Sequence, residues 1–464
     1  MDIDYSRRHS DSSPCIAKHH YPSVEKERSA SRVVAPFLVA NQPSQLHWLQ
    51  LRNRETAVEK NEFFADARDD LTGPLAGVRV LEITTTWAGP MAGVVLADLG
   101  ADTIRVEMLS GDVARAMIPL PDTEVHLMHA TVNRNKRSLT VDLTTDEGRQ
   151  ILLDLVATCD IMLENFKAGT LARNGLGYEA VKAVKPDIVY VSVTGWGQYG
   201  PDHQAAGYDP MAQATSGFMS VNGNPDAPPT KAGTWLADDI GGLHGAIGAM
   251  AALRHRDQTG EGQYVDVSML DTMIFQTNGL PTLGSLGVDP GRWGNALGFV
   301  VPCDVYDCSD GLIYAGVLLD AHWVLLAELI GQPELGHHES FATREARAAN
   351  RDVCDMMFGA WLAEHTRDEA VDTLRALGLP AARVQTFAEV VSDPHVIERN
   401  MMQPTTQYDG HSVDIVGPPV KFSRTPTTIR TPAASLGQHN DEVLDELGID
   451  QETRAKLRAA GIIG

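Results

Sequence analysis

The chain has 464 residues, of which 43% are hydrophobic and 21% charged, proportions typical of a globular protein with room for two or three domains. Its 61 acidic residues outnumber its 38 basic ones, and the formal charge of −23 argues against a nucleic-acid partner or an anionic membrane surface. The five cysteines are scattered without zinc-site spacing, and we recognise no secretory or membrane-spanning segment, so we expect a cytoplasmic protein with reduced thiols and no bound metal.

Residues 1–72 differ in character from the rest of the chain. They are rich in Ser, His, Arg and Glu and show little hydrophobic periodicity before Leu46. We interpret them as a partly flexible N-terminal extension, with one candidate helix around residues 45–67. Regular alternation of apolar strands and helices begins at Gly73, and we therefore start the first domain there.

Strands and helices alternate from residue 73 to residue 295. Strands are predicted at 78–83, 103–107, 138–143, 160–164, 188–193 and 263–267, and helices at 88–99, 146–158, 178–184 and after Asp238. Strand–helix–strand units of this length are typical of a parallel sheet covered by helices. The predicted fold class is therefore α/β, with a large, Rossmann-like parallel-sheet domain over residues 73–295.

The remainder of the chain divides into two parts. Near residues 300–395, strands are predicted at 303–306 and 312–319 and helices at 321–330 and 350–364, which indicates a smaller α/β domain. Residues 396–464 return to mixed strand and loop and end in a charged helix. We predict that this C-terminal segment returns to the large domain.

A glycine-rich run, Gly195-Trp196-Gly197-Gln198-Tyr199-Gly200, fits the G-x-G-x-x-G pattern and follows a predicted strand. A dinucleotide fingerprint must also open a helix, whereas the next residues, Pro201-Asp202-His203, are typical of a loop. We therefore interpret these glycines as a tight turn at the carboxyl end of a strand, where ligands of α/β proteins usually bind.

The stretch from Leu236 to Gly242 places Asp238 where a helix is predicted to begin. Turn-prone residues lie upstream, and the apolar positions that start at Ile240 repeat with helical spacing downstream. On spacing alone, an Asp in this place is most often an N-cap that accepts backbone N–H bonds. The alternative is a catalytic carboxylate, and the local pattern does not separate the two roles.

A set of motifs adds information that the single carboxylate lacks. They occupy residues 74–81, 87–90, 96–102, 133–138, 164–166, 194–201, 207–209, 259–263 and 436–444. In this order they resemble the family III CoA-transferases, the group that includes formyl-CoA transferase and carnitine CoA-transferase. The resemblance covers residues 73 to about 450 and leaves out the N-terminal extension.

The resemblance assigns roles to particular residues. It implies that Asp238, which precedes Gly242 in the family's D-x-x-x-G pattern, is the nucleophile, and that Asp239 is a cap or a neighbouring charge. The CoA contacts that it implies are Asn165, Phe166 and Arg173.

Further candidates lie near these motifs. Lys136 and Arg137 are candidate CoA-binding cations, although charges at strand ends are most often simply solvated. The candidates for the substrate pocket or the oxyanion site are Trp87, Tyr208, Gly241 and Gly242. The glycine-rich loop that covers the intermediate in the family has only a weak counterpart here, between Gly291 and Gly298.

This sequence departs from the formyl-CoA transferase pattern at three positions. Trp87 stands where those enzymes carry an active-site glutamine, and Ala206 and Met108 replace basic CoA contacts. An indole offers a large apolar wall with one N–H donor, whereas a glutamine suits a small polar acid. We therefore expect a substrate that is larger or less polar than oxalate.

The predicted activity is transfer of CoA from an acyl-CoA donor to a free carboxylic acid through aspartyl anhydride and aspartyl-CoA thioester intermediates. One alternative of the same fold is an α-methylacyl-CoA racemase or epimerase, which is disfavoured because those enzymes carry a histidine base where Tyr208 stands here. Another is a non-catalytic acyl-CoA-binding protein, which the presence of Asp238 disfavours. The resemblance further implies an interlocked homodimer with no permanently bound cofactor and with coenzyme A as a substrate.

Overall fold

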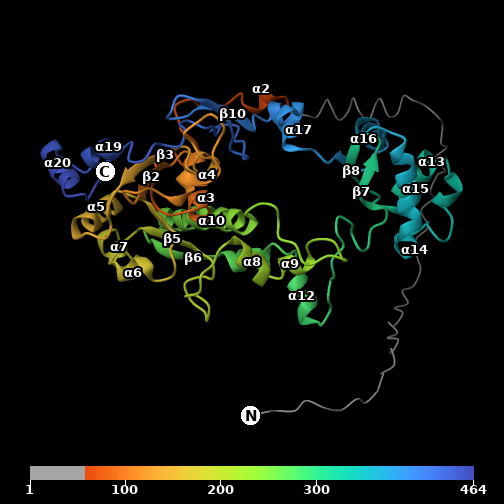
Figure 1. Ribbon diagram of the computed structural model, residues 1–464, viewed down its shortest axis with the longest axis horizontal. Coiled ribbons are helices and arrows are strands. Elements are labelled where there is room, and N and C mark those ends of the chain that lie inside the picture. Colours follow the sequence, from red (N-terminus) through yellow and green to blue (C-terminus); the bar gives the residue numbers. More distant parts are fainter. Residues whose placement is uncertain (1–57) are drawn as a thin grey trace, which may run out of the picture. The chain divides into compact units, whose positions relative to one another are not determined.

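The computed structural model describes residues 58–464 (Figure 1). Of the helix predicted around residues 45–67, the described part contains α2 (Lys60–Phe63), and residues 1–57 lie outside the described range. The N-terminal end of the described chain contacts its C-terminal part, since Lys60 pairs with Glu398 at 3.5 Å and the Arg68 amide donates to the Arg424 carbonyl.

A six-stranded sheet forms the large domain. Its strands are β1 (Arg79–Ile83), β2 (Asp102–Glu107), β3 (Lys136–Thr140), β4 (Ile161–Glu164), β5 (Val189–Thr194) and β6 (Gln263–Ser268). All neighbours run parallel, in the order β3-β2-β1-β4-β5-β6. The predicted parallel α/β sheet is therefore confirmed, and its order is that of the Rossmann fold.

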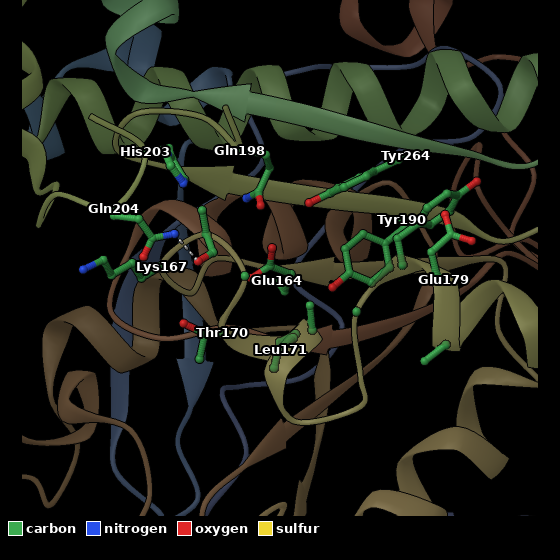
Figure 2. A pocket seen from close by; sticks show the side chains of 16 residues that line it. Glu164, Lys167, Thr170, Leu171, Glu179, Tyr190, Gln198, His203, Gln204 and Tyr264 are labelled. Atoms are coloured by element: carbon green, nitrogen blue, oxygen red, sulfur yellow. Dashed lines mark hydrogen bonds between the residues drawn. The ribbon is translucent and has the colours of Figure 1, made fainter. Parts of the chain in front are cut away.

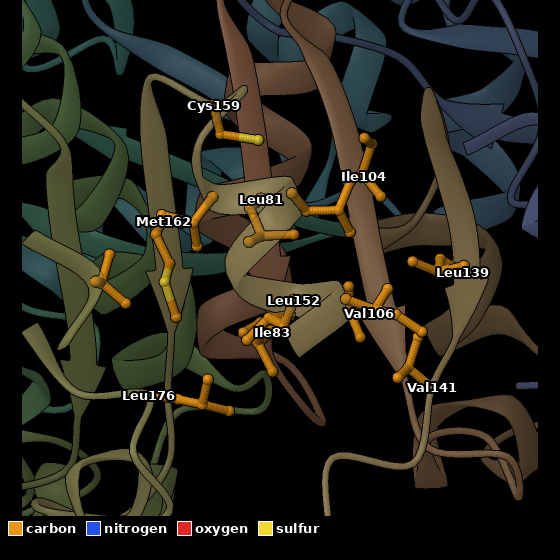
Figure 3. Packing of buried hydrophobic residues seen from close by; sticks show 14 of the residues in the cluster. Leu81, Ile83, Ile104, Val106, Leu139, Val141, Leu152, Cys159, Met162 and Leu176 are labelled. Atoms are coloured by element: carbon orange, nitrogen blue, oxygen red, sulfur yellow. The ribbon is translucent and has the colours of Figure 1, made fainter. Parts of the chain in front are cut away.

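Successive residues of the central strand β1 serve two different cores. Leu81 and Ile83 face the cluster that α5 (Asp146–Val156) and α7 (Tyr178–Val184) complete (Figure 3), while Val80 faces the cluster under α3 (Ala88–Asp98) and α10 (Leu236–Thr259). Side chains alternate along a strand, so a strand covered on both faces is mostly apolar. The buried exception in β1 is Glu82, which pairs with Arg105 and Lys136.

Small residues let α10 approach the sheet and α3 closely. A Cβ atom on Gly242 would lie 2.6 Å from the Met91 Cβ, and one on Gly245 would lie 2.8 Å from a Val193 methyl. Both contacts are too short for any side chain, so glycine is required at these positions. This packing fixes the helix that carries Asp238.

The second region is built on a three-stranded antiparallel sheet with its own core. Its strands are β7 (Cys303–Cys308), β8 (Gly311–Gly316) and β9 (Ala381–Arg383), and its main helices are α13 (Asp320–Leu329), α15 (Arg351–Ala363) and α16 (Arg367–Ala376). Trp323 and Phe358 are fully buried at its centre. The predicted second strand ends at Gly316 rather than at residue 319, and the third strand was not predicted because it has only three residues.

The C-terminal segment contacts the large sheet. It contains the antiparallel pair β10 (Met402–Thr406) and β11 (Ser412–Val416), then α19 (Asn440–Glu446) and α20 (Gln451–Ala459). The Asn440 side-chain oxygen accepts from the Thr140 amide at 2.8 Å, and Ile463 forms a β-bridge with Val141. Residues 300 or more positions apart in the sequence thus meet at β3.

Several short helices were not predicted from the sequence. The longer α16, with ten residues, was also not predicted. The short ones are α4 (Leu127–Val132), α6 (Thr170–Arg173), α8 (Asp209–Thr215), α9 (Phe218–Val221), α11 (Met269–Phe275), α12 (Leu280–Ser285), α14 (Arg344–Ala349), α17 (Phe387–Ser392) and α18 (Pro394–Glu398). Each spans one or two turns, too few for hydrophobic periodicity to show. Among residues 58–464, no helix combines the length and the apolar character needed to cross a membrane.

Candidate active site

A cavity of about 460 Å³ opens beside the carboxyl ends of β1, β4 and β5. The strand order reverses between β1 and β4, and ligands of open α/β sheets bind at such a point. The residues that line this cavity include Thr85, Thr86, Trp87, Asn165, Lys167, Tyr208 and Asp238. We call it the switch-point cavity.

Asp238 lies in the first turn of α10 but does not cap it. The capping group is Asp209, buried at the start of α8, whose Oδ2 accepts from the Ala237 amide at 2.7 Å and from the Asp238 amide at 3.4 Å. Within residues 58–464, no group donates a hydrogen bond to the Asp238 carboxylate. This carboxylate is therefore left to the cavity, and the N-cap role considered from the sequence belongs to another residue.

The surroundings of Asp238 disfavour its charged form. Burial, followed by the negative charges of Asp209 and Asp239, raises the pKa of Asp238 to about 7. A carboxyl poised between its two protonation states near neutral pH, at the edge of a cavity, is typical of a functional group.

Trp87 connects the wall of the switch-point cavity to the acidic pair. It is only 8% exposed, its ring lies 4.9 Å from that of Trp235, and its indole Nε1 donates to Asp239 Oδ1 at 2.6 Å. Burial raises the pKa of Asp239, and the indole hydrogen bond opposes that rise. Asp239 therefore accepts a hydrogen bond from Trp87, whereas the carboxylate of its neighbour Asp238 accepts none within residues 58–464.

Asn165 acts within the protein as a clamp between β4 and the loop after β1. Its Oδ1 accepts from the Thr85 amide and its Nδ2 donates to the Thr85 carbonyl, each at 2.8 Å. The next amide, that of Phe166, donates to Glu164 Oε2 at 2.8 Å. The Asn-Phe pair therefore shapes the carboxyl edge of the sheet, whether or not it also contacts a ligand.

A second cavity, of about 580 Å³, shares Lys167 with the first (Figure 2). One wall is formed by Tyr178, Tyr190 and Tyr264, with ring centroids 5.1 to 5.8 Å apart. Glu164 lies at its base, where burial raises the pKa to about 7 against the opposing hydrogen bond from Ser192. We call this space the tyrosine cavity.

The sequence matches one family model, that of CoA-transferase family III, over residues 75–440. The chain belongs to this family. Succinyl-CoA:mesaconate CoA-transferase from Haloarcula hispanica is 36% identical over 391 residues, which cover 82% of this chain and 98% of that protein. Formyl-CoA:oxalate CoA-transferase from Streptomyces avermitilis is 33% identical over 413 residues, covering 85% of this chain and all of the relative.

A solved structure agrees with the family assignment. The crystal structure of a CAIB/BAIF family protein from Brucella suis superimposes with a TM-score of 0.73 at 35% identity, covering 81% of this chain and 100% of that one. The chain is therefore an enzyme of CoA-transferase family III that moves CoA between an acyl-CoA and a carboxylic acid.

The cations expected to bind CoA in this family III chain are placed differently from one another. Arg173 lies in α6, where its guanidinium donates to Thr170 on the rim of the tyrosine cavity at 3.1 Å. Lys136 is fully buried, with its Nζ 2.7 Å from Glu82, and Arg137 pairs with carboxylates that include Asp102 at 2.6 Å. The structure does not bring Lys136 or Arg137 to either cavity.

The two glycines considered for the oxyanion site lie inside α10, in its second turn. Backbone N–H groups at that depth in a helix bond to carbonyls four residues earlier. A Cβ atom on Gly241 would lie 3.0 Å from Met269, and Gly242 meets α3 as described above. Their surroundings give both glycines a packing role.

Of the remaining candidates from the sequence, Tyr208 lines a cavity and the glycine-rich loop does not. Tyr208 is 62% exposed and lines the switch-point cavity near Asp238. The loop from Gly291 to Gly298 lines neither cavity and is held instead by Arg292, which donates to the Ala227 carbonyl at 2.8 Å. In the described part of the chain, no cluster of His, Cys, Asp and Glu is arranged to hold a metal ion.

Some residues of the site were not predicted from the sequence. Thr86 and Lys167 carry no motif that separates them from ordinary polar residues. Asp209 lies in the motif at residues 207–209, but its capping role follows from a tertiary contact. The glycine-rich run has two causes: Gly197 and Gly200 have positive φ angles of 81° and 100°, and a Cβ on Gly195 would lie 2.6 Å from the Gly207 Cα. This contact brings the loop that carries Tyr208 to the carboxyl end of β5.

Proposed function

We propose that Asp238 is the nucleophile through which this enzyme transfers CoA. The observation that supports it best is the carboxylate itself, which faces the cavity at the sheet's switch point, has no internal hydrogen-bond donor and has its pKa raised to about 7. Burial leaves this carboxylate poorly solvated, and the nearby negative charges of Asp209 and Asp239 destabilise its charged form further, which favours attack on a carbonyl.

The reaction conserves thioester energy in two covalent steps. The Asp238 carboxylate attacks the acyl-CoA carbonyl, and the C–S bond breaks to give an aspartyl–acyl anhydride and CoA thiolate. The thiolate then attacks the aspartyl carbonyl, which releases the first acid as a carboxylate and leaves an aspartyl-CoA thioester. The acceptor carboxylate runs the same two steps in reverse and leaves with CoA.

Each step passes through an oxyanion that needs a donor or a positive potential nearby. The N-terminus of α10 supplies partial positive charge in the turn that carries Asp238. The exposed hydroxyl of Tyr208 is the side-chain donor that we assign to this task, since it lines the same cavity.

We infer that CoA extends from the switch-point cavity into the tyrosine cavity. Lys167 lines both, and in the described part of the chain it has no ion-pair partner. Arg173 stands beside the tyrosine cavity through its contact with Thr170. Two cations along this route suit the phosphates of CoA.

We propose that the acids exchanged are dicarboxylates of four to six carbons, with oxalate a poor acceptor. The wall formed by Trp87 and backed by Trp235 is large and apolar, and its single N–H donor is already used by Asp239. A small, doubly charged acid would find no free donor on this wall, whereas the methylene groups of a longer acid can pack against it.

We also propose that the protein is an interlocked homodimer. Large apolar side chains are exposed along the segment between the two domains, including Phe275 at 75%, Leu286 at 72% and Phe299 at 65%. Apolar residues grouped in this way mark a protein–protein contact. Light scattering at low micromolar concentration should give twice the chain mass, and a monomeric mass would reject the dimer.

The function is tested by mixing succinyl-CoA with a panel of free acids and following the CoA esters by mass spectrometry. Asp238→Ala should abolish transfer, while the adjacent Asp239→Asn keeps a measurable fraction and serves as the matched control. The opposite result, an active Asp238→Ala and a dead Asp239→Asn, would move the nucleophile by one residue. No transfer by the wild-type enzyme with any donor and acid would reject the proposal.

A further inference from the structure

A buried carboxylate outside the reacting set reaches the loop that shapes the switch-point cavity. Asp112 follows β2 and caps the short helix η1 (Val113–Ala116), with Oδ1 3.1 Å from the Ala114 amide. Its side chain is 3% exposed and pairs with Arg105, which is 2% exposed. This pair alone would make Asp112 a structural residue.

The same carboxylate also holds the loop between β1 and α3. Oδ2 accepts from the Thr86 amide at 3.0 Å, and Oδ1 accepts from the Thr85 hydroxyl at 3.1 Å. Thr86 has φ +67°, a left-handed conformation that is unfavourable for a β-branched residue. Such a conformation persists only where the surroundings impose it, and Asp112 is the group that accepts from its amide.

This conformation determines where the next side chain points. Thr85, Thr86 and Trp87 all line the switch-point cavity. From this loop, the Trp87 indole donates to Asp239, the residue adjacent to Asp238. A line of direct contacts therefore runs from Asp112 through Thr86 and Trp87 to the acidic pair.

We propose that Asp112 is a positioning residue of the transfer site, which holds Thr86 in its left-handed conformation and thereby sets the Trp87 wall and its hydrogen bond to Asp239. The catalytic part of this inference rests on the proposed function of Asp238. The alternative is that Asp112 only balances the buried charge of Arg105.

Glu107 provides a matched control for that alternative. Its side chain is 1% exposed, lies 3.7 Å from Arg105 and pairs with Arg115 at 2.7 Å. It also accepts from the Ser138 hydroxyl, and no group of the loop between β1 and α3 contacts it within residues 58–464. Asp112 and Glu107 thus neutralise the same arginine, and only Asp112 touches the loop.

The experiment compares Asp112→Asn with Glu107→Gln. Every partner of either carboxylate is a donor, so the new amide NH₂ group must face a donor in both variants and both should lose thermal stability. Asp112→Asn should also lower kcat on the order of 10- to 100-fold, with the KM for succinyl-CoA changed by less than about threefold, as expected when a reacting group is misplaced. Glu107→Gln should keep kcat within about twofold.

A spectroscopic signal reports on the loop without using turnover. The Trp87 and Trp235 rings, 4.9 Å apart, should give a coupled near-ultraviolet circular dichroism band, identified as the band lost in Trp87→Phe. Asp112→Asn should lose most of this band and Glu107→Gln should keep it. If Asp112→Asn does not fold, Asp112→Glu keeps the charge opposite Arg105 while displacing the carboxylate, and the same losses are expected.

Rescue gives the last test. Glycine adopts positive φ without steric cost, so adding Thr86→Gly to Asp112→Asn should recover part of the lost kcat and of the band. Equal kcat losses in Asp112→Asn and Glu107→Gln, or a band that survives in Asp112→Asn, would overturn the positioning role. A wild-type enzyme without CoA transfer would contradict the proposed function instead, and the circular dichroism comparison would still decide the loop contact.

Discussion

Replacing Asp238 by asparagine should make the protein more stable at alkaline pH while removing its activity. The raised pKa of Asp238 means that the native state binds this proton more tightly than the unfolded chain does. Between pH 4 and pH 7, the stability contributed by this group therefore falls as the pH rises, because ionisation is easy only in the unfolded state. Above pH 7 nearly the full cost is present, and below about pH 3 almost none remains.

The size of this stability difference follows from the shift in the pKa of Asp238. A change from 3.8 to about 7 corresponds to at most about 4 kcal/mol at 1.36 kcal/mol per pKa unit. Asp238 borders an open cavity, so solvent screening reduces this to about 1 to 2 kcal/mol. For a protein of this size, the melting temperature of Asp238→Asn should exceed that of the wild type by about 1 to 3 °C at pH 8.

The assay is thermal unfolding of the wild type and Asp238→Asn at pH 8 and at pH 4.5. The difference at pH 8 should become clearly smaller at pH 4.5, and it should approach zero near pH 3, where the unfolded chain also holds this proton. Asp209→Ala is the control and should lower the melting temperature at both values, because it removes the acceptor for the Ala237 amide at the start of α10. A lower melting temperature for Asp238→Asn at pH 8, or a gain at pH 4.5 as large as the gain at pH 8, would refute the account of this carboxylate.

Further predictions concern the wall, the clamp, the pH profile and the N-terminal residues. Trp87→Gln should change the relative kcat/KM among acceptor acids in favour of smaller ones, and an unchanged acceptor profile would reduce Trp87 to a packing residue. Asn165→Ala removes both hydrogen bonds to Thr85 and should cost about 1 to 3 kcal/mol in urea unfolding. The acidic limb of kcat/KM should have its midpoint near the Asp238 pKa of about 7, so that activity at pH 6 is about a tenth of the plateau, and a midpoint near pH 4 would contradict this. A chain that begins at Val58 should keep the transfer activity, and a folded truncation without turnover would show that residues 1–57 take part.

The sheet could be predicted from the sequence because its signals are local. The central strands are short, mostly apolar runs between turn residues, and helices such as α5 have a clear apolar face. The strand order could not be read in this way, since pairing of β1 with both β2 and β4 depends on contacts between distant segments. The short helices near the cavities were not predicted for the same reason, because tertiary contacts rather than hydrophobic periodicity stabilise them.

In the candidate site, too, local sequence signals identified some residues, and contacts between distant segments determined others. The D-x-x-x-G register led to Asp238, which the structure places at the switch-point cavity. Local reasoning could not find that the cap of α10 comes from Asp209, 29 residues earlier in the chain. It also treated Lys136 as a cation at a strand end, whereas Glu82 on β1 pairs with it two strands away inside the protein. Side chains that act across the fold leave no pattern in their own neighbourhood.

The most direct test of the central claim is to isolate the covalent intermediate. The enzyme is incubated with succinyl-CoA in the absence of an acceptor acid, quenched in acid, digested and analysed by tandem mass spectrometry. The account predicts one peptide that carries CoA in thioester linkage, with the added mass on Asp238, and no such peptide from Asp238→Asn. A CoA adduct on Asp239 or on any other residue, or rapid transfer with no protein-bound CoA, would contradict it.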